Sequence, residues 1–207
     1  MTELLSRKDR ERQAKRQDIL KAARVVFAEK GLHAATLDEI AEKAEFAKGT
    51  LYTYFQNKED LFVSMLEQEI LDFHEELKQV LARDLPPAEI LSQLVRAMMA
   101  AFDQNMDLMR LLSQERSALA TCRGGDQMEA RFLPHFHRLN AAVASLVRRG
   151  IAQGAFRRVD PERAATAVFN LCHGAAMASY LNKKRIDSPE EAAFITGLLL
   201  QGIAAGK

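Results

Sequence analysis

The sequence predicts an all-α protein, and three observations support this. Alanine and leucine dominate, Trp is absent and β-branched residues are sparse, a composition that favours helix. Apolar residues recur at helical spacing in one segment after another. No stretch of useful length alternates as a half-buried strand would. We therefore expect about nine helices, arranged as a three-helix head (residues 1–58) and a larger helical body (residues 59–207).

One longer helix and one short helix are expected first. Residues 16–30 carry apolar side chains at helical spacing, and Gly31 follows as a C-cap. Thr36 and Glu39 have the spacing of a capping box, which starts a short helix that runs through Ala44.

The remaining helices follow from caps and breaks. Asn57, with Asp60 three residues on, opens a long helix that Pro86-Pro87 ends. Asp160-Pro161 and Ser188-Pro189 each place a capping oxygen before a proline at the first helical position. The later helices are expected over residues 88–103, 105–119, 127–153, 161–182 and 189–205, with Gly124-Gly125 as the clearest break.

The segment from Thr36 to Phe55 has the layout of a helix-turn-helix: a short capped helix, a three-residue turn and a second short helix. In the second helix Leu51 and Phe55 lie four residues apart and can face the core. Gly49 lets backbone approach closely. The outward side chains supply hydroxyls and one ammonium, which suit phosphate oxygens and base edges; they are Lys48, Thr50, Tyr52, Thr53 and Tyr54.

Lys58 stands in the first turn of the next helix, where a cation opposes the helix dipole unless an anion compensates it. A DNA phosphate would supply that anion.

This region resembles the N-terminal signature of the TetR family of bacterial regulators, over about a quarter of the chain. The motif reads Thr36-x-x-x-Ile40-Ala41-x-x-Ala44, then Lys48-Gly49-Thr50-Leu51-Tyr52-x-Tyr54-Phe55-x-x-Lys58-Glu59-x-Leu61. The resemblance implies that Thr36, Thr53, Tyr54 and Lys58 hold phosphate, and that Lys48, Gly49 and Tyr52 meet bases.

Three turn residues depart from the family pattern. Glu45 stands where glycine is usual, and a positive φ there would strain the backbone by roughly 1 kcal/mol. Phe46 replaces a smaller apolar residue, and Ala47 replaces a Ser or Thr cap that is worth about 1 kcal/mol. These residues change the edge that reads the bases.

Residues 7–24 hold eight cations against three acids. Such a run is either a solvated helix face or a contact to DNA. With a helix-turn-helix beside it, Arg12, Lys15 and Arg16 become candidates for phosphate or an adjacent minor groove, and both interpretations stay open.

The body carries a stripe rich in methionine, a flexible residue that suits a pocket for varied apolar ligands. Isolated polar residues lie in otherwise apolar helices, and a ligand could be their hydrogen-bond partner. Ordinary core packing is the alternative for both. The expected effector is small and largely apolar, and its candidate contacts are Met98, Phe102, Met106, Met109, Phe136, Asn140, Asn170 and His173.

A homodimer is expected through residues 161–205. Gly174 and the alanines near it allow close approach of helices, and residues 189–205 carry more apolar faces than one neighbour needs. Leu199 is among the apolar residues expected in the interface. The family resemblance implies a four-helix interface.

The composition and motifs disfavour other classes. Two cysteines, Cys122 and Cys172, have no ligand-like spacing, and His135 and His137 lie two apart, which is wrong for a helical metal pair. We expect no metal, no cofactor, no signal peptide and no membrane span, and a cytoplasmic regulator rather than an enzyme. The main hypothesis is a repressor that its effector releases from operator DNA. The alternative is a DNA-bound platform for another protein, without an effector.

Overall fold

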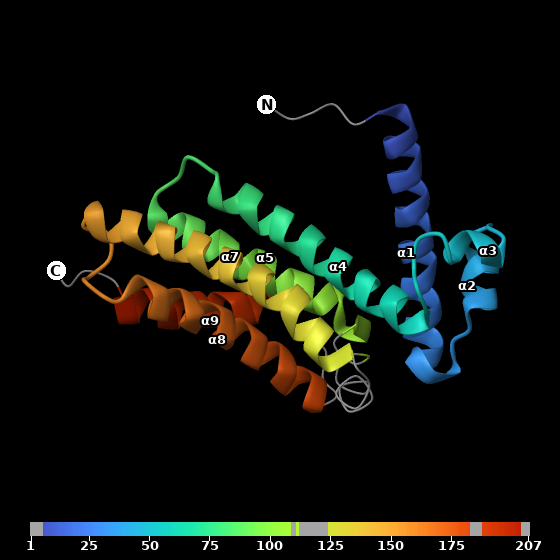
Figure 1. Ribbon diagram of the computed structural model, residues 1–207. Helices are drawn as coiled ribbons and strands as arrows, with labels where there is room; N and C mark the ends of the chain where they lie inside the picture. The colour runs from blue at the N-terminus through green and yellow to red at the C-terminus, as the bar shows by residue number, and fades with distance from the viewer. Residues whose placement is uncertain (1–5, 109–110, 112–123, 183–187, 204–207) are drawn as a thin grey trace. The chain divides into compact units, whose positions relative to one another are not determined.

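Eight α-helices lie within residues 6–108, 111, 124–182 and 188–203, which the structure, a computed structural model, describes (Figure 1). They are α1 (Arg7–Ala34), α2 (Leu37–Lys43), α3 (Lys48–Leu51), α4 (Lys58–Leu81), α5 (Pro87–Gln104), α7 (Gly124–Ala152), α8 (Pro161–Leu181) and α9 (Ser188–Ile203). The predicted all-α class is confirmed. The expected helix over residues 105–119 lies mostly outside the described residues.

The described residues form two compact units, one within Met1–Glu69 and Leu111–Arg131 and the other within Ile70–Arg110 and Phe132–Lys207. The division falls inside α4 and α7, so each of these helices contributes to both units. The boundary expected after residue 58 falls at the first residue of α4 and stays a prediction.

Helix α1 is longer than the apolar spacing predicted. It begins at Arg7 because Ser6 caps it: the Asp9 N–H donates to Ser6 Oγ at 3.2 Å. At its other end Gly31 has a φ of 75°, a left-handed conformation that glycine adopts without strain. The helix buries one face, where the Phe27 and Phe62 rings meet edge to face with centroids 5.1 Å apart.

The starts of α2 and α4 follow the predicted caps. The Glu39 N–H donates to Thr36 Oγ1 (3.3 Å) and the Thr36 N–H donates to Glu39 Oε2 (3.1 Å), which completes the capping box. The Asp60 N–H donates to Asn57 Oδ1 at 2.7 Å, ahead of α4.

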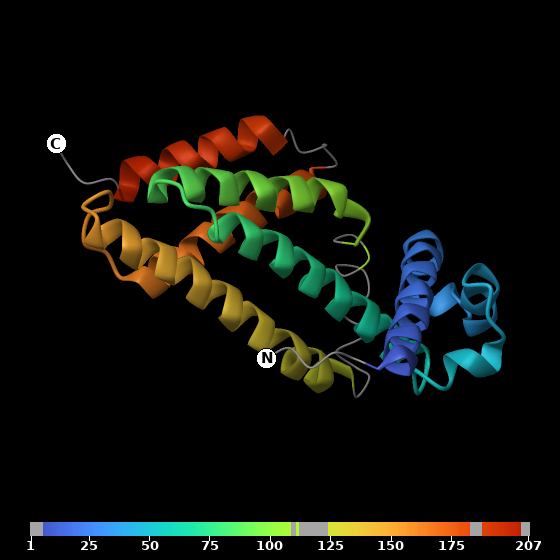
Figure 2. The same cartoon turned by 90° about the horizontal axis from the view of Figure 1, so that it is seen from above.

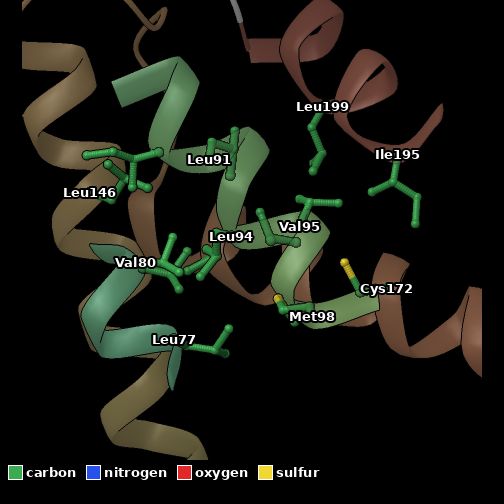
Figure 3. Packing of buried hydrophobic residues seen from close by; sticks show 14 of the residues in the cluster. Leu77, Val80, Leu91, Leu94, Val95, Met98, Leu146, Cys172, Ile195 and Leu199 are labelled. Atoms are coloured by element: carbon green, nitrogen blue, oxygen red, sulfur yellow. The ribbon is translucent and has the colours of Figure 1, made fainter. Parts of the chain in front are cut away.

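The second unit is a helical bundle in which α5 packs against both α8 and α9, and Figure 2 shows α9 running beside α5. Its core joins side chains of α4, α5, α7, α8 and α9 (Figure 3). Leu77, Leu91, Leu94 and Cys172 in this core are fully enclosed.

Candidate DNA-binding surface and effector pocket

The turn between α2 and α3 ends α2 in a Schellman arrangement. The Phe46 N–H donates to the Ala41 carbonyl at 2.9 Å and the Glu45 N–H to the Glu42 carbonyl at 3.0 Å. In this arrangement the first residue after the helix cap adopts a left-handed conformation, and Glu45, at that position, has a φ of 59°. Glu45 therefore has the positive φ on which the expected backbone strain depends. Ala47 caps α3 without a side-chain hydrogen bond, as its side chain dictates.

The recognition segment, residues 48–55, buries the two residues predicted for its core and leaves its polar residues accessible. Leu51 and Phe55 are buried, whereas Tyr52 is 54% exposed. A Cβ built on Gly49 would meet nothing within 4 Å, so the backbone there is open to a bound molecule. The other polar groups, exposed or half-buried, are Lys48, Thr50, Thr53 and Tyr54. The face expected to read DNA is thus accessible.

Lys48 has an acidic neighbour that the sequence did not indicate. Its Nζ donates to Asp38 Oδ2 at 2.8 Å, and this bond raises the pKa of Lys48 above its ordinary value. Both side chains are exposed. DNA that binds Lys48 must therefore compete with Asp38.

Thr36 and Lys58 lie close to each other in the fold, because Lys58 reaches back to the end of α1. Lys58 Nζ donates to the carbonyls of His33 (3.0 Å) and Ala35 (2.8 Å). These carbonyls compensate the cation that the sequence assigned to phosphate. An ammonium has three N–H donors, so one remains for another acceptor. The Thr36 oxygen accepts the capping bond, and the Thr36 side chain also hydrogen-bonds the Glu39 carboxylate.

The basic end of α1 lies over the recognition segment. The guanidinium carbon of Arg12 is 5.9 Å from the centroid of the Tyr54 ring, and that of Arg16 is 5.4 Å from the Phe55 centroid. Both distances are within cation–π range.

A small apolar hollow of about 10 Å³ lies among α5, α7 and α8. Asn140 is the one polar residue in its lining, and Thr166 Oγ1 lies 3.2 Å from Asn140 Oδ1. The lining is Met98, Phe136, Leu139, Asn140, Val143, Ala165, Val168 and Phe169. Met98, Phe136 and Asn140 were predicted. The others repeat at intervals of three or four along α7 and α8, a signal that could have identified them.

Three other predicted pocket residues lie near the hollow but outside its lining. His173 stacks on Phe169 with centroids 6.0 Å apart, and Phe102 meets His173 edge to face at 6.1 Å. Met106 packs against the core. Asn170 is exposed, away from the hollow, and Met109 lies outside the described residues.

A histidine pair beside this aromatic group was not predicted. The His74 and His135 rings are 6.0 Å apart, and Arg138 donates to His135 Nδ1 at 3.0 Å. Burial, followed by the charges of His135 and Arg138, lowers the pKa of His74 to about 4. His74 is therefore neutral near pH 7.

Arg131, on α7, makes a polar cluster with the beginning of α4. Its guanidinium donates to Glu67, to Ser64 Oγ (3.1 Å) and to Asp60 Oδ1 (3.4 Å). The carboxylates lie 64 and 71 residues away along the chain, so sequence spacing gave no sign of the contact.

The exposed faces of α8 and α9 differ from those expected. Leu199 is 8% exposed and packs into the core, whereas Phe194 and Leu198 are 66% and 50% exposed. The expectation that Leu199 lies in a dimer interface is wrong, because its side of α9 is covered by the core. On α8, Asn170 shares an exposed face with Gly174 and Ala178, spaced four apart.

Two features argue against a reactive thiol or a metal site among the described residues. Burial raises the pKa of the Cys172 thiol to about 12, so its reactive thiolate is scarce. No group of three or more metal-binding side chains occurs in the described part of the chain.

A wider, open groove of about 530 Å³ lies along α4 and α5, lined by Glu76, Gln79, Val80, Arg83, Gln93, Arg96 and Ala97.

Two family models match the chain. One, described as bacterial regulatory proteins of the tetR family, covers residues 19–65. The other, described as a tetracyclin repressor-like C-terminal domain, covers residues 84–177. The chain belongs to the TetR family. This TetR-family protein is a DNA-binding transcriptional regulator, and the resemblance noted in its helix-turn-helix is confirmed.

Individual relatives agree. The chain is 28% identical to the HTH-type transcriptional regulator YhgD of Bacillus subtilis over 156 residues, which cover 74% of this chain and 78% of the relative. It is 30% identical to the fatty acid metabolism regulator protein of Bacillus subtilis over 112 residues, 53% of this chain and 58% of that one.

The fold is shared with the Bacillus subtilis regulator FadR, solved in complex with stearoyl-CoA. The two structures have a TM-score of 0.74 at 22% identity, over 90% of this TetR-family chain and 98% of FadR. Among the described helices, none is both long and apolar enough to cross a membrane.

Proposed function

We propose that this regulator is a dimeric repressor that leaves its operator when a small, largely apolar effector with an acyl chain enters the body. The observation that carries the DNA-binding part is the accessible polar face of the recognition segment, which two buried anchors, Leu51 and Phe55, fix to the head. Lys48, Gly49 and Tyr52 read bases, and Thr50, Thr53 and Tyr54 supply hydroxyls to the DNA backbone. Thr36 and the remaining N–H of Lys58 hold a phosphate.

Two copies bind the operator together, because one recognition helix covers half a site. A two-fold pair reads successive major grooves roughly 34 Å apart. The exposed apolar residues of α8 and α9, Phe194 and Leu198 with the small residues around Gly174, are the proposed contact between copies. Asn170 belongs to this surface rather than to the pocket. The protein acts in the cytoplasm, where bacterial DNA lies, and we assign it no catalytic role.

The effector enters the hollow among α5, α7 and α8. Its present volume of about 10 Å³ holds at most a single water molecule, so the three helices must part to admit a ligand. This requirement gives the ligand different affinities for two shapes of the dimer. To change operator occupancy about a hundredfold it must prefer one shape by roughly 2.7 kcal/mol, which about 100 Å² of extra apolar burial supplies.

An acyl chain fits the apolar wall, in which Asn140 is the single polar side chain. The fatty acid metabolism regulator protein that resembles this chain at 30% identity supports this ligand class, as does the stearoyl-CoA held by FadR, which shares the fold.

A second candidate is a DNA-bound platform that needs no effector. The close packing around the hollow favours this candidate, because side chains that already fill the interior leave no space for a ligand.

The two candidates differ in one experiment. The DNA sequence that the protein prefers is first selected from a random duplex library, and the complex is then titrated with C12–C18 fatty acids and with their CoA thioesters. Release of DNA by one of these compounds, together with a raised melting temperature of the free protein, is the expected result. Neither effect at any chain length would favour the platform.

A matched pair of variants locates the site. Val168→Leu adds a methylene to the wall of the hollow, and Val147→Leu adds the same group to the core outside the lining. We expect Val168→Leu to weaken the effector response at least several-fold more than Val147→Leu. Equal responses would place the ligand elsewhere.

A further inference from the structure

The first half of α1 carries a stripe of cations that have no acidic partner in the described part of the chain. Lys8, Arg12 and Arg16 follow one another at intervals of four, and Lys15 lies three beyond Arg12. These four side chains therefore share one face of the helix. None of them forms an ion pair with a described residue. We call this face the cationic stripe.

The acids nearby are engaged elsewhere. Arg7 Nε donates to Glu11 Oε1 at 2.8 Å, and the Ser6 hydroxyl donates to Asp9 Oδ2 at 2.5 Å. Asp18 lies three residues beyond Lys15, at the border of the stripe, and forms no ion pair with it. The positive charge of this face is thus not neutralised by its own helix.

The stripe continues the face of α1 that packs into the head. Ile19 and Ala23 on this face are fully buried, and Arg12 and Arg16 lie over Tyr54 and Phe55 of the recognition segment. In Figure 1 the N-terminal half of α1 extends past α2 and α3. The stripe therefore adjoins the surface proposed to hold DNA.

We propose that the cationic stripe is a second DNA-binding surface, which holds the phosphate backbone beyond the bases read by α3. From Lys8 to Arg16 it runs about 12 Å along the helix. Duplex DNA presents one charge for about every 1.7 Å of its axis, so a stripe of this length meets several phosphates. This inference rests on the proposed function, since it needs the recognition segment to be seated on duplex DNA.

The test uses two double variants of equal charge change. Lys8→Gln/Lys15→Gln removes two cations of the stripe and leaves the ring contacts of Arg12 and Arg16 intact. Arg10→Gln/Lys21→Gln removes two exposed cations from the opposite face of α1. All four residues are exposed, so both variants are expected to fold. The affinity of each full-length protein for the selected duplex is measured from 50 to 200 mM KCl.

Loss of two phosphate contacts from each copy of a dimer removes four in all. The slope of log affinity against log salt should become shallower by about 3 to 4 in the stripe variant. Over this fourfold range of salt, the wild-type affinity then falls roughly a hundredfold more than that of the stripe variant. The control variant should keep the wild-type slope.

The outcomes separate the two proposals. Equal slopes in the two variants would overturn the proposal that the cationic stripe binds DNA and would leave operator recognition by α3 standing. Failure of the wild-type protein to bind any duplex in the library at 50 mM KCl would overturn the proposed function, and the stripe with it.

Discussion

The recognition segment and the effector hollow differ in where their functional side chains lie: at the surface in the first, within the core in the second. In the recognition segment the polar groups are exposed or half-buried, and the fixed parts are two apolar anchors, Leu51 and Phe55. In the hollow, Asn140 stands alone among apolar side chains that also form the core. A substitution in the recognition segment can therefore change binding while the fold survives. In the body the same residues hold the fold and face the ligand, so each test there needs a matched variant.

The largest expected effect comes from α9, where adjacent leucines face different surroundings. Leu199→Glu places a carboxylate in the core and should destabilise the protein by more than about 4 kcal/mol. Leu198→Glu leaves the fold intact and should shift the dimer to a monomer of 23.2 kDa. Thermal melts and light scattering measure the two. If both variants melted like the wild type, the assignment of Leu199 to the core-facing side of α9 would be wrong.

That pair shows where sequence reasoning failed. Leu198, Leu199 and Leu200 are consecutive, so apolar spacing alone does not say which of them faces α5. The choice depends on packing against a helix about a hundred residues earlier, which no local signal encodes. The same reason explains Asn170, which was expected in the pocket and lies on an exposed face.

The head was predictable because its signals are short in sequence. The capping box joins residues three apart, and the left-handed turn at Glu45 follows from bonds five residues or fewer in span. What the sequence missed there were the longer contacts: Lys48 with Asp38, and Lys58 with carbonyls more than twenty residues earlier.

The second prediction separates base reading from backbone contact. Lys48→Ala should change the preferred sequence and weaken the best site roughly 10- to 100-fold, whereas Tyr54→Phe should weaken all sequences by about fivefold. Repeated selection of DNA with each variant measures this. Because Lys48→Ala also leaves Asp38 unpaired beside the DNA, Asp38→Asn/Lys48→Ala is the control. An unchanged preferred sequence in both lysine variants would remove Lys48 from base reading.

The third prediction concerns pH and the body. The pKa of His74 is about 4 in the folded protein, below its ordinary value of 6.5, so the unfolded chain binds more protons between these values. His74 thus lowers the free energy of unfolding as pH falls from 6.5 toward 4, by at most about 1.4 kcal/mol per pH unit. Denaturant titrations of wild type and His74→Gln should show a flatter pH dependence for the variant. Parallel curves would mean that His74 is solvated.

The smallest effect is expected in the head, at the one described non-glycine residue with a positive φ. Glu45→Gly relieves a left-handed conformation that costs a side-chain-bearing residue about 1–2 kcal/mol, but it adds chain entropy to the unfolded state worth about 0.5–1 kcal/mol. The net gain should be about 0.5–1 kcal/mol, a rise of about 1–3 °C in Tm. Glu45→Gln keeps the strain and removes the same charge, so it should leave the Tm near that of the wild type. An equal rise in both variants would assign the effect to charge, and the turn would then carry no strain.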